Sequence, residues 1–212
     1  MSKKINYIVY DLETGGFSAE KNPITEVAMI AIDGETLEET SRYTTFVQPY
    51  LNLEYDPQAL KATGIDMNMI MSGKDAKVVS REVSNFITSQ GTGLNKKPIL
   101  CGHNIIKFDN PFLYKLLNLT KKDLYSIINK DIFIDTMWWS RLKTPVDSDS
   151  FGKHNLTSAC NREGIELVDA HRAMNDTSAN ARLVVSYLQN LRGKGVVKSV
   201  EEKHSFRDTF KI

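Results

Sequence analysis

Four carboxylates and one imidazole, spread over three parts of the chain, are the side chains with the clearest chemical potential. Asp11 and Glu13 lie near the N-terminus, Asp109 lies in the middle, and His171 and Asp176 lie nearer the C-terminus. Carboxylate oxygens are ligands that Mg²⁺ prefers, and an imidazole with a pKa of about 6.5 can accept a proton near neutral pH. The set therefore indicates metal-assisted hydrolysis of a phosphodiester bond.

The triplet Asp11-Leu12-Glu13 directly follows the apolar run Tyr7 to Tyr10, which predicts a strand. Side chains alternate along a strand, so both carboxylates face one side and Leu12 faces the other. Two carboxylates on one face repel each other unless a cation compensates their charge, and a divalent metal would do so. A second acidic triplet, at 33–35, falls in a predicted hairpin turn and is interpreted as turn chemistry.

Of the remaining three residues, Asp109 and His171 each have two interpretations. Asp109 follows a predicted central strand, so it either enters a ligand crevice at the carboxyl end of that strand or only caps the helix that follows. His171 and Asp176 would point about 140° apart on one helix. If His171 instead lies in a loop and Asp176 in the first turns of the helix, both can face one cleft, where His171 could act as a general base. A purely structural histidine is the alternative.

The helices and strands that must position these residues predict an α/β protein. Strands are expected at 6–11, 24–33 and 36–47, with a hairpin turn at Asp33-Gly34, and Pro49 ends this meander. Helices and strands then alternate, with expected elements at 56–64 (helix), 76–87 (helix), 98–103 (strand), 112–119 (helix), 131–135 (strand), 136–142 (helix), from 156 (helix) and 175–191 (helix). The Lys-containing segment 193–212 is expected to be a solvated or partly disordered basic tail, which leaves residues 1–192 as one domain.

Composition restricts the class of protein. With 41% hydrophobic and 25% charged residues, the 212-residue chain resembles neither a disordered nor a membrane protein. A net charge of +1 supplies no long-range field, so any polyanion must be held locally. The first residues lack a signal-peptide pattern, which predicts a cytoplasmic protein without a membrane partner. Cys101 and Cys160 lack zinc-site spacing and are expected to be buried, reduced thiols.

Three short motifs carry a family resemblance. DLETGG at 11–16, HNIIKFD at 103–109 and HRAMND at 171–176 resemble the three exonuclease motifs of the DnaQ-like 3′→5′ exonuclease superfamily, in its DEDDh branch. IDT at 134–136 and the segment 153–160 extend the likeness over roughly residues 5 to 192. Members of that superfamily include the epsilon subunit of DNA polymerase III and ribonuclease T. The resemblance implies a ribonuclease H-like fold, whose central five-stranded mixed sheet has three antiparallel and then two parallel strands, flanked by helices.

The same resemblance implies an activity and roles for single residues. The activity would be release of nucleoside 5′-monophosphates from the 3′ end of single-stranded nucleic acid, with DNA favoured over RNA although the sequence does not locate a contact to the 2′-hydroxyl. Two divalent cations, Mg²⁺ or Mn²⁺, would be held by Asp11, Glu13, Asp109 and Asp176, and His171 would be the base. The nucleotide would be bound by Leu12, Thr14, Gly15, Ile65 and Asn104. For Leu12 and Ile65, a place in the hydrophobic core is an equal alternative.

Two other functions stay in view. One is a catalytically silent domain that binds nucleic acid or docks onto a polymerase, and a DNA polymerase or a second copy of this chain would then be its protein partner. The other is a dinucleotide-binding protein, although Gly15-Gly16 follow an acidic triplet rather than forming GxGxxG.

Several further side chains are interpreted as structural. His103 is expected to be hydrogen-bonded in the structure, Asp135 to cap a helix, and one residue of the pair Trp138-Trp139 to be core and the other partly exposed. His154 shows no partner in the sequence. Lys96-Lys97 and Lys121-Lys122 could contact phosphates, with solvated surface as the default.

Overall fold

A five-stranded mixed sheet forms the centre of the protein. The computed structural model describes residues 5–93, 96–144, 154–167 and 172–209, with side chains described as far as residue 193. The strand order is β3-β2-β1-β4-β5. β1, β2 and β3 pair antiparallel, whereas β4 runs parallel to β1 and β5 runs parallel to β4. The α/β class and the expected mixed sheet are therefore confirmed.

All five predicted strands are present, in the sequence order expected. They are β1 (Tyr7–Thr14), β2 (Ile24–Ile32), β3 (Glu39–Phe46), β4 (Ile99–Gly102) and β5 (Phe133–Asp135). β1 continues past the expected end at Asp11, so Asp11, Leu12 and Glu13 all lie within a regular strand. Their side-chain directions are thus fixed by the pleat.

The helices also follow the predicted pattern, with two short additions. They are α1 (Pro57–Thr63), α2 (Met67–Ser72), α3 (Ala76–Ser89), α4 (Asp109–Asn118), α5 (Thr136–Lys143), α6 (Leu156–Arg162) and α7 (Ala173–Thr209), with a 3₁₀ helix η1 at Leu124–Ser126. α1 begins and ends as its sequence predicts, because Asp56 caps it, Pro57 opens it and Gly64 closes it at φ 66°. The sequence did not predict α2 and η1, because segments of this length are too short to show a period.

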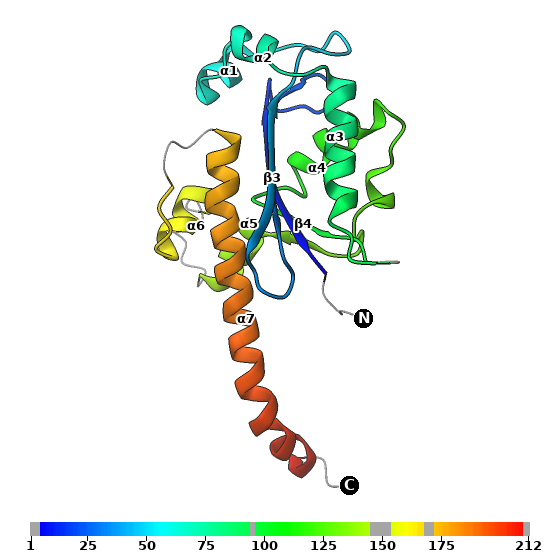
Figure 1. Ribbon diagram of the computed structural model, residues 1–212. Helices are drawn as coiled ribbons and strands as arrows, with labels where there is room; N and C mark the ends of the chain where they lie inside the picture. The colour runs from blue at the N-terminus through cyan, green and yellow to red at the C-terminus, as the bar shows by residue number, and fades with distance from the viewer. Residues whose placement is uncertain (1–4, 94–95, 145–153, 168–171, 210–212) are drawn as a thin grey trace.

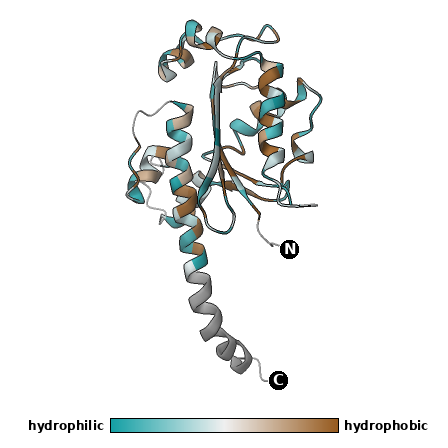
Figure 2. Cartoon of the chain, viewed as in Figure 1, coloured by the Kyte–Doolittle hydropathy of each residue, from teal (hydrophilic) through white to brown (hydrophobic). Residues whose placement is uncertain are grey.

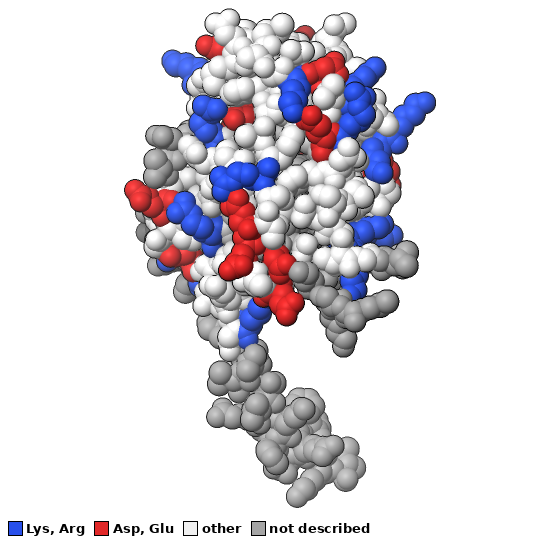
Figure 3. Space-filling model, in the orientation of Figure 1, with Lys and Arg blue, Asp and Glu red and all other residues white. Residues whose placement is uncertain are grey.

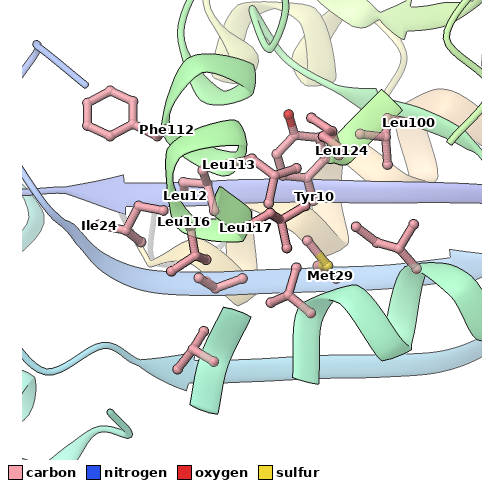
Figure 4. Close-up of a cluster of buried hydrophobic side chains, with 14 of the residues drawn as sticks. Tyr10, Leu12, Ile24, Met29, Leu100, Phe112, Leu113, Leu116, Leu117 and Leu124 are labelled. Carbon is pink, nitrogen blue, oxygen red and sulfur yellow. The ribbon is translucent and has the colours of Figure 1, made fainter. Parts of the chain in front are cut away.

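Helices cover both faces of the sheet (Figure 1). α7 lies on one face, and α3 and α4 lie on the other. Alternate residues of β1 divide between the two faces: Tyr10 and Leu12 join the core under α3 and α4, whereas Val9 joins the core under α7. Figure 4 shows Tyr10 and Leu12 near the α4 side chains that fill the first of these cores. β2 is buried along its whole length because both of its faces are covered.

The sides of the helices that face the sheet are hydrophobic (Figure 2). On α3, the buried residues recur at helical spacing, and Asp75 caps the helix by accepting hydrogen bonds from the backbone N–H groups of Lys77 and Val78. Burial of this stripe holds the helix against the sheet. Both cysteines are buried free thiols, as expected.

The prediction for the C-terminal segment was wrong in one respect. The helix expected at 175–191 does not end before Gly193, and its backbone continues to Thr209, beyond the edge of the sheet (Figure 1). Two glycines each cost about 1 kcal/mol in a helix relative to alanine, but they allow helical dihedral angles, and no proline follows residue 145. Nothing in the local sequence therefore forces the helix to stop. In the described residues, no helix is both long and apolar enough to cross a membrane.

Candidate active site

Asp11, Glu13 and Asp176 come together at the end of β1. One carboxylate oxygen from each lies within 4.8 Å of those of the other two. Asp11 and Glu13 are on the face of β1 that is covered by α7, as the alternation of the strand predicts, and Asp176 is in the first turn of α7. Residues 165 positions apart in the chain thus share one acidic site.

Asp176 reaches this site because the N-terminal part of α7 is packed against the sheet. Its buried residues include Ala173, Thr177, Ala181 and Val184, which lie on the same side of the helix. The buried amide of Asn180 accepts a hydrogen bond from the hydroxyl of Thr136 at 2.8 Å, which fixes the rotation of the helix. Helix packing, rather than local sequence, therefore brings Asp176 to the end of β1.

Asp109 approaches the site from the opposite face of the sheet. It is the first residue of α4, it is 3% exposed, and its Oδ1 accepts a hydrogen bond from the backbone N–H of Leu12 at 3.2 Å. The position before it, Phe108, makes no side-chain capping bond. The alternative that Asp109 only caps a helix is therefore wrong, because its carboxylate reaches across to β1 between Asp11 and Glu13. Among the described residues, Asp109 is outside the 4.8 Å cluster of three.

Burial and mutual repulsion disfavour the charged forms of these carboxylates. Burial, followed by the charges of Asp109 and Glu13, raises the pKa of Asp11 well above its usual value. Burial, followed by the charge of Asp176, raises the pKa of Glu13 to about 7. Burial also raises the pKa of Asp109 to about 8, although the hydrogen bond from Leu12 opposes this shift. Bound cations would offset these costs, since they favour deprotonated carboxylates.

A fifth carboxylate, Glu26, belongs to the same region and was not identified from the sequence. It lies on β2 directly opposite Glu13, and it is 4% exposed. Its carboxylate contacts the guanidinium of Arg172 at 3.3 Å and accepts a hydrogen bond from the backbone N–H of Ala173, the first residue of α7, at 3.4 Å. Glu26 therefore ties the start of α7 to the sheet. Only the register of β1 and β2 reveals this relationship.

The loop that leads to Asp109 is held by Asp135. Its carboxylate accepts hydrogen bonds from the backbone N–H groups of Asn104 at 2.9 Å, Ile106 at 3.4 Å and Met137 at 3.1 Å. The last of these caps α5 as predicted, and the first two anchor the preceding loop. Asn104 has a φ of 64°, a left-handed conformation that asparagine tolerates better than most residues.

The predicted structural role of His103 is confirmed. Its two ring nitrogens lie 2.9 Å from the hydroxyl of Thr136 and 2.8 Å from the backbone carbonyl of His154. His154 has partners that the sequence did not reveal, because its Nδ1 lies 3.0 Å from the hydroxyl of Ser140. Trp139 is packed against Tyr187, whereas Trp138 is 44% exposed, as expected for adjacent helical positions.

Apart from Asn104, described above, the residues predicted to bind the nucleotide divide into two groups. Leu12 and Ile65 have buried side chains, at 4% and 1% exposure, and Leu12 belongs to the core under α4. Thr14 is the last residue of β1 and Gly15 follows it, and the hydroxyl of Thr14 donates to the carbonyl of Gly16 at 2.7 Å. A side chain at Gly15 would meet the ring of Tyr55 at 2.9 Å, so the backbone there is closely packed. A role for these residues in binding a nucleotide stays a prediction.

The donor set fits hard divalent cations. The converging ligands are all carboxylate oxygens, which suit Mg²⁺ and Mn²⁺. The positive charge of Arg172 lowers the pKa of Glu13 and so opposes the effect of burial, and the same guanidinium contacts Glu26. His171 lies outside the described residues. The helix begins at Ala173 with Asp176 in its first turn, so Asp176 occupies the position that the sequence analysis required.

Comparison with known proteins agrees with this geometry. The family model described as exonuclease matches residues 8–184. The DNA polymerase III PolC-type of Bacillus subtilis (strain 168) is 31% identical over 191 residues, which cover 90% of this chain and 12% of that protein. The corresponding protein of Staphylococcus haemolyticus is 26% identical over 99% of this chain and 13% of its own length. The chain thus corresponds to only a small part of these polymerases.

Solved structures share the fold at low sequence identity. Exonuclease I of E. coli, in complex with a dT13 oligonucleotide, superposes with a TM-score of 0.73 at 18% identity, over 92% of this chain and 43% of that one. A 3′-exonuclease bound to a histone mRNA stem-loop superposes with a TM-score of 0.68 at 18% identity, over 89% of this chain and 65% of that one. With its ribonuclease H-like sheet, its acidic cluster and the family match over most of its length, the chain belongs to the exonuclease family of the DnaQ-like type.

Proposed function

We propose that this protein is a metal-dependent 3′→5′ exonuclease that removes nucleoside 5′-monophosphates from single-stranded nucleic acid. The observation that carries the proposal is the convergence of Asp11, Glu13 and Asp176 within 4.8 Å, with Asp109 bonded to the backbone between the first two. Family membership supports the reaction class. The proposal extends to a two-metal mechanism and to His171 as the base.

The acidic residues would bind the cations and fix the position of the scissile phosphate. Two divalent cations, when bound, would lower the pKa of an attacking water and stabilise charge on the leaving oxygen. Asp11, Glu13 and Asp176 supply converging ligands, and Asp109 supplies a fourth carboxylate from the α4 side. The protein's contribution is to hold these groups in place before substrate arrives, because β1, α4 and α7 are all packed into the core.

His171 would accept the proton of the attacking water. It stands five residues before Asp176 and directly before Arg172, whose guanidinium contacts Glu26. Its assignment rests on the motif HRAMND and on the chemistry of a neutral imidazole. The rate should therefore rise with pH as His171 loses its proton, and a rate independent of pH from acid to alkaline conditions would count against this role.

The substrate is proposed to be DNA rather than RNA. The PolC-type relatives are DNA polymerases, and the E. coli neighbour is bound to an oligodeoxynucleotide. The same fold also occurs in a neighbour bound to an mRNA stem-loop, so the fold alone does not select DNA. A DNA polymerase is the proposed protein partner, since the relatives contain the matching segment within a polymerase.

The test is a matched pair of DNA and RNA oligonucleotides, labelled at the 5′ end and sampled over time with Mg²⁺ or Mn²⁺. Stepwise shortening from the 3′ end, lost in EDTA and in Asp11→Ala, is the expected result. Tight binding without shortening of either strand, in both metals, would instead favour a silent domain that binds nucleic acid or docks onto a polymerase. Equal rates on DNA and RNA would refute only the proposed preference for DNA, and the proposed exonuclease activity would stand.

A further inference from the structure

A cationic groove lies away from the acidic cluster, between α3 and the segment that follows α4. Its volume is about 530 Å³. It is lined by Lys77, Arg81, Ser84, Asn85, Leu119, Thr120, Lys121 and Lys122. Four of these side chains are cationic, three are neutral and polar, one is apolar, and none is a carboxylate. Figure 3 shows Lys and Arg side chains along the side of the molecule that carries α3.

The four cations of this groove form no ion pair with any residue that the structure describes. In the described part of the chain, none of their side-chain nitrogens contacts a carboxylate, whereas nearby Lys74 forms an ion pair with Glu82 at 2.8 Å. Because the whole chain has a net charge of only +1, four unpaired cations in one groove are a local concentration of positive charge. Like charges held together repel each other, and an anion in the groove would relieve that repulsion.

The interaction of cations with helix dipoles does not explain the positions of all four cationic side chains. Lys121 and Lys122 follow the C-terminus of α4, where the helix dipole favours cations. Lys77 and Arg81, however, lie in the N-terminal half of α3, and the dipole disfavours Lys77 in the first turn. A ligand that draws on both sides of the groove explains the two pairs together.

The walls of the groove are fixed. The hydroxyls of Ser80 and Thr120 lie 2.7 Å apart, which joins α3 to the segment after α4. The backbone N–H of Lys122 donates to the carbonyl of Leu117 at 3.1 Å, and Lys121 has a left-handed φ of 56°. Glycine is the residue that this position usually favours, and a side chain there costs about 1 kcal/mol. The lysine side chain is thus presented from a constrained turn.

We infer that this groove binds the phosphate backbone of the nucleic-acid strand whose 3′ end lies in the acidic site, an inference that rests on the proposed function. Lysine, arginine, hydroxyl and amide donors are the groups that contact phosphate oxygens. α4 connects the two places: Asp109 opens it and the groove lies at its other end, about 15 Å away at helical rise. An acidic protein segment fits less well, because cores of protein interfaces are rich in aromatic and apolar groups and this groove offers one leucine.

The experiment measures binding of a 5′-fluorescein-labelled deoxythymidine oligonucleotide of about 20 nucleotides by anisotropy, in EDTA and over a series of salt concentrations. Lys121→Glu with Lys122→Glu should weaken binding at low salt by at least about tenfold. It should also reduce the slope of log K against log salt by about 1.4, since each phosphate contact to a single strand contributes about 0.7. Lys77→Gln with Arg81→Gln should give the same reduction from the other wall.

The matched control is Lys97→Glu with Lys130→Glu, which makes the same change of charge at two lysines that line a separate pocket. It should leave the salt slope near that of the unchanged protein. Thermal unfolding of each variant verifies folding, and the glutamine pair provides the test if the glutamate pair does not fold. Groove variants that bind the oligonucleotide like the control would overturn the inference. Groove variants that lose only the binding of an acidic peptide, and keep the binding of the oligonucleotide, would overturn it as well.

Kinetics separate this inference from the proposed function. If the protein shortens oligonucleotides, the groove variants should raise KM for the long strand and leave hydrolysis of a dinucleotide unchanged. If no strand is shortened under any condition, the proposed function fails, but the binding measurement still decides whether the groove holds the backbone. An equal effect on the dinucleotide and the long strand would place the defect in the acidic site and refute the groove.

Discussion

Glu13 of β1 lies directly opposite Glu26 of β2, and the pairing of the two strands shifts register immediately after Glu13. Glu13 turns toward Asp11 and Asp176, whereas Glu26 contacts Arg172 and the first backbone N–H of α7. Irregular pairing of this kind recurs beside active sites, where it directs a side chain. Two neighbouring glutamates thus differ in their contacts: Glu13 faces the acidic cluster, and Glu26 contacts the start of the helix that carries Asp176.

Glu26→Gln should lower the rate of hydrolysis by about 10–100-fold, the range found for residues that orient metal ligands. The amide keeps the size of the side chain but weakens the contacts to Arg172 and Ala173, so α7 is held less firmly. Single-turnover rates over a range of Mg²⁺ concentrations measure the effect. Glu39→Gln, which breaks the exposed pair with Arg42 at 2.7 Å, is the control and should change little. Unaltered rates in Glu26→Gln would show that the helix does not need this anchor.

Asp11→Asn should lower the rate of hydrolysis by more than the roughly 100-fold that loss of an orienting residue causes, because it removes a proposed metal ligand itself. In EDTA the same variant should unfold at a higher temperature than the unchanged protein, since asparagine avoids the cost of placing an ionisable carboxyl where burial and the neighbouring carboxylates disfavour its charged form. Glu35→Gln is the matched control, because Glu35 is an exposed carboxylate of the other acidic triplet. A full rate in Asp11→Asn, or equal losses in both variants, would contradict the site.

Stability without metal should fall as pH rises from about 5 to about 8. The folded-state pKa values of Glu13 and Asp109, about 7 and about 8, are above the ordinary values of their side chains. Between the ordinary and the folded values, the folded protein binds more protons than the unfolded chain, so its free energy of unfolding decreases with pH. Thermal unfolding in EDTA, followed by circular dichroism, measures this dependence.

Mg²⁺ should reverse that trend, because it binds the deprotonated carboxylates and stabilises the folded protein by mass action. The rise in Tm on adding Mg²⁺ should therefore be larger at about pH 8 than at about pH 5. Glu13→Gln should flatten the dependence measured in EDTA. A metal-free Tm that increases over this range would refute the pKa shifts from which the prediction follows.

Asp135→Ala should reduce the free energy of unfolding by about 2 kcal/mol, since three backbone N–H groups lose a charged acceptor. Urea denaturation measures the change. Asp123→Ala is the control: Asp123 caps only the short η1 through Tyr125, and its loss should cost about 0.5–1 kcal/mol. Equal losses in the two variants would mean that the bonds to Asn104 and Ile106 contribute nothing.

The sequence predicted the strand that carries the first motif and the direction of its side chains, because alternation along a strand is a local property. It also placed Asp176 in the first turn of a helix and His103 in a hydrogen-bonded position, and both are confirmed. It left open whether Asp109 is a cap, since a carboxylate before a helix has the same local pattern in either role. The bond to Leu12 is a contact between residues 97 positions apart.

Glu26 shows most clearly what local patterns leave out. In the sequence it is the one charged residue within a mostly apolar strand, and only the register of β1 and β2 places it opposite Glu13. The groove that Lys77 and Arg81 share with Lys121 and Lys122 likewise depends on how α4 and the segment after it pack near α3. The prediction that the last helix ends at residue 191 is wrong, because glycine weakens a helix without ending it.

The amino-acid sequence by itself determined the chemistry of this protein: which carboxylates exist, which strand and helix ends carry them, and which motifs they belong to. The tertiary structure decided that Asp11, Glu13 and Asp176 share one site, that Asp109 approaches β1 from the other face, and that Glu26 anchors α7. The physical reason is the range of the forces involved. Side-chain periodicity follows from backbone geometry within a few residues, whereas strand register and helix rotation follow from burying apolar surface that is distant in the chain.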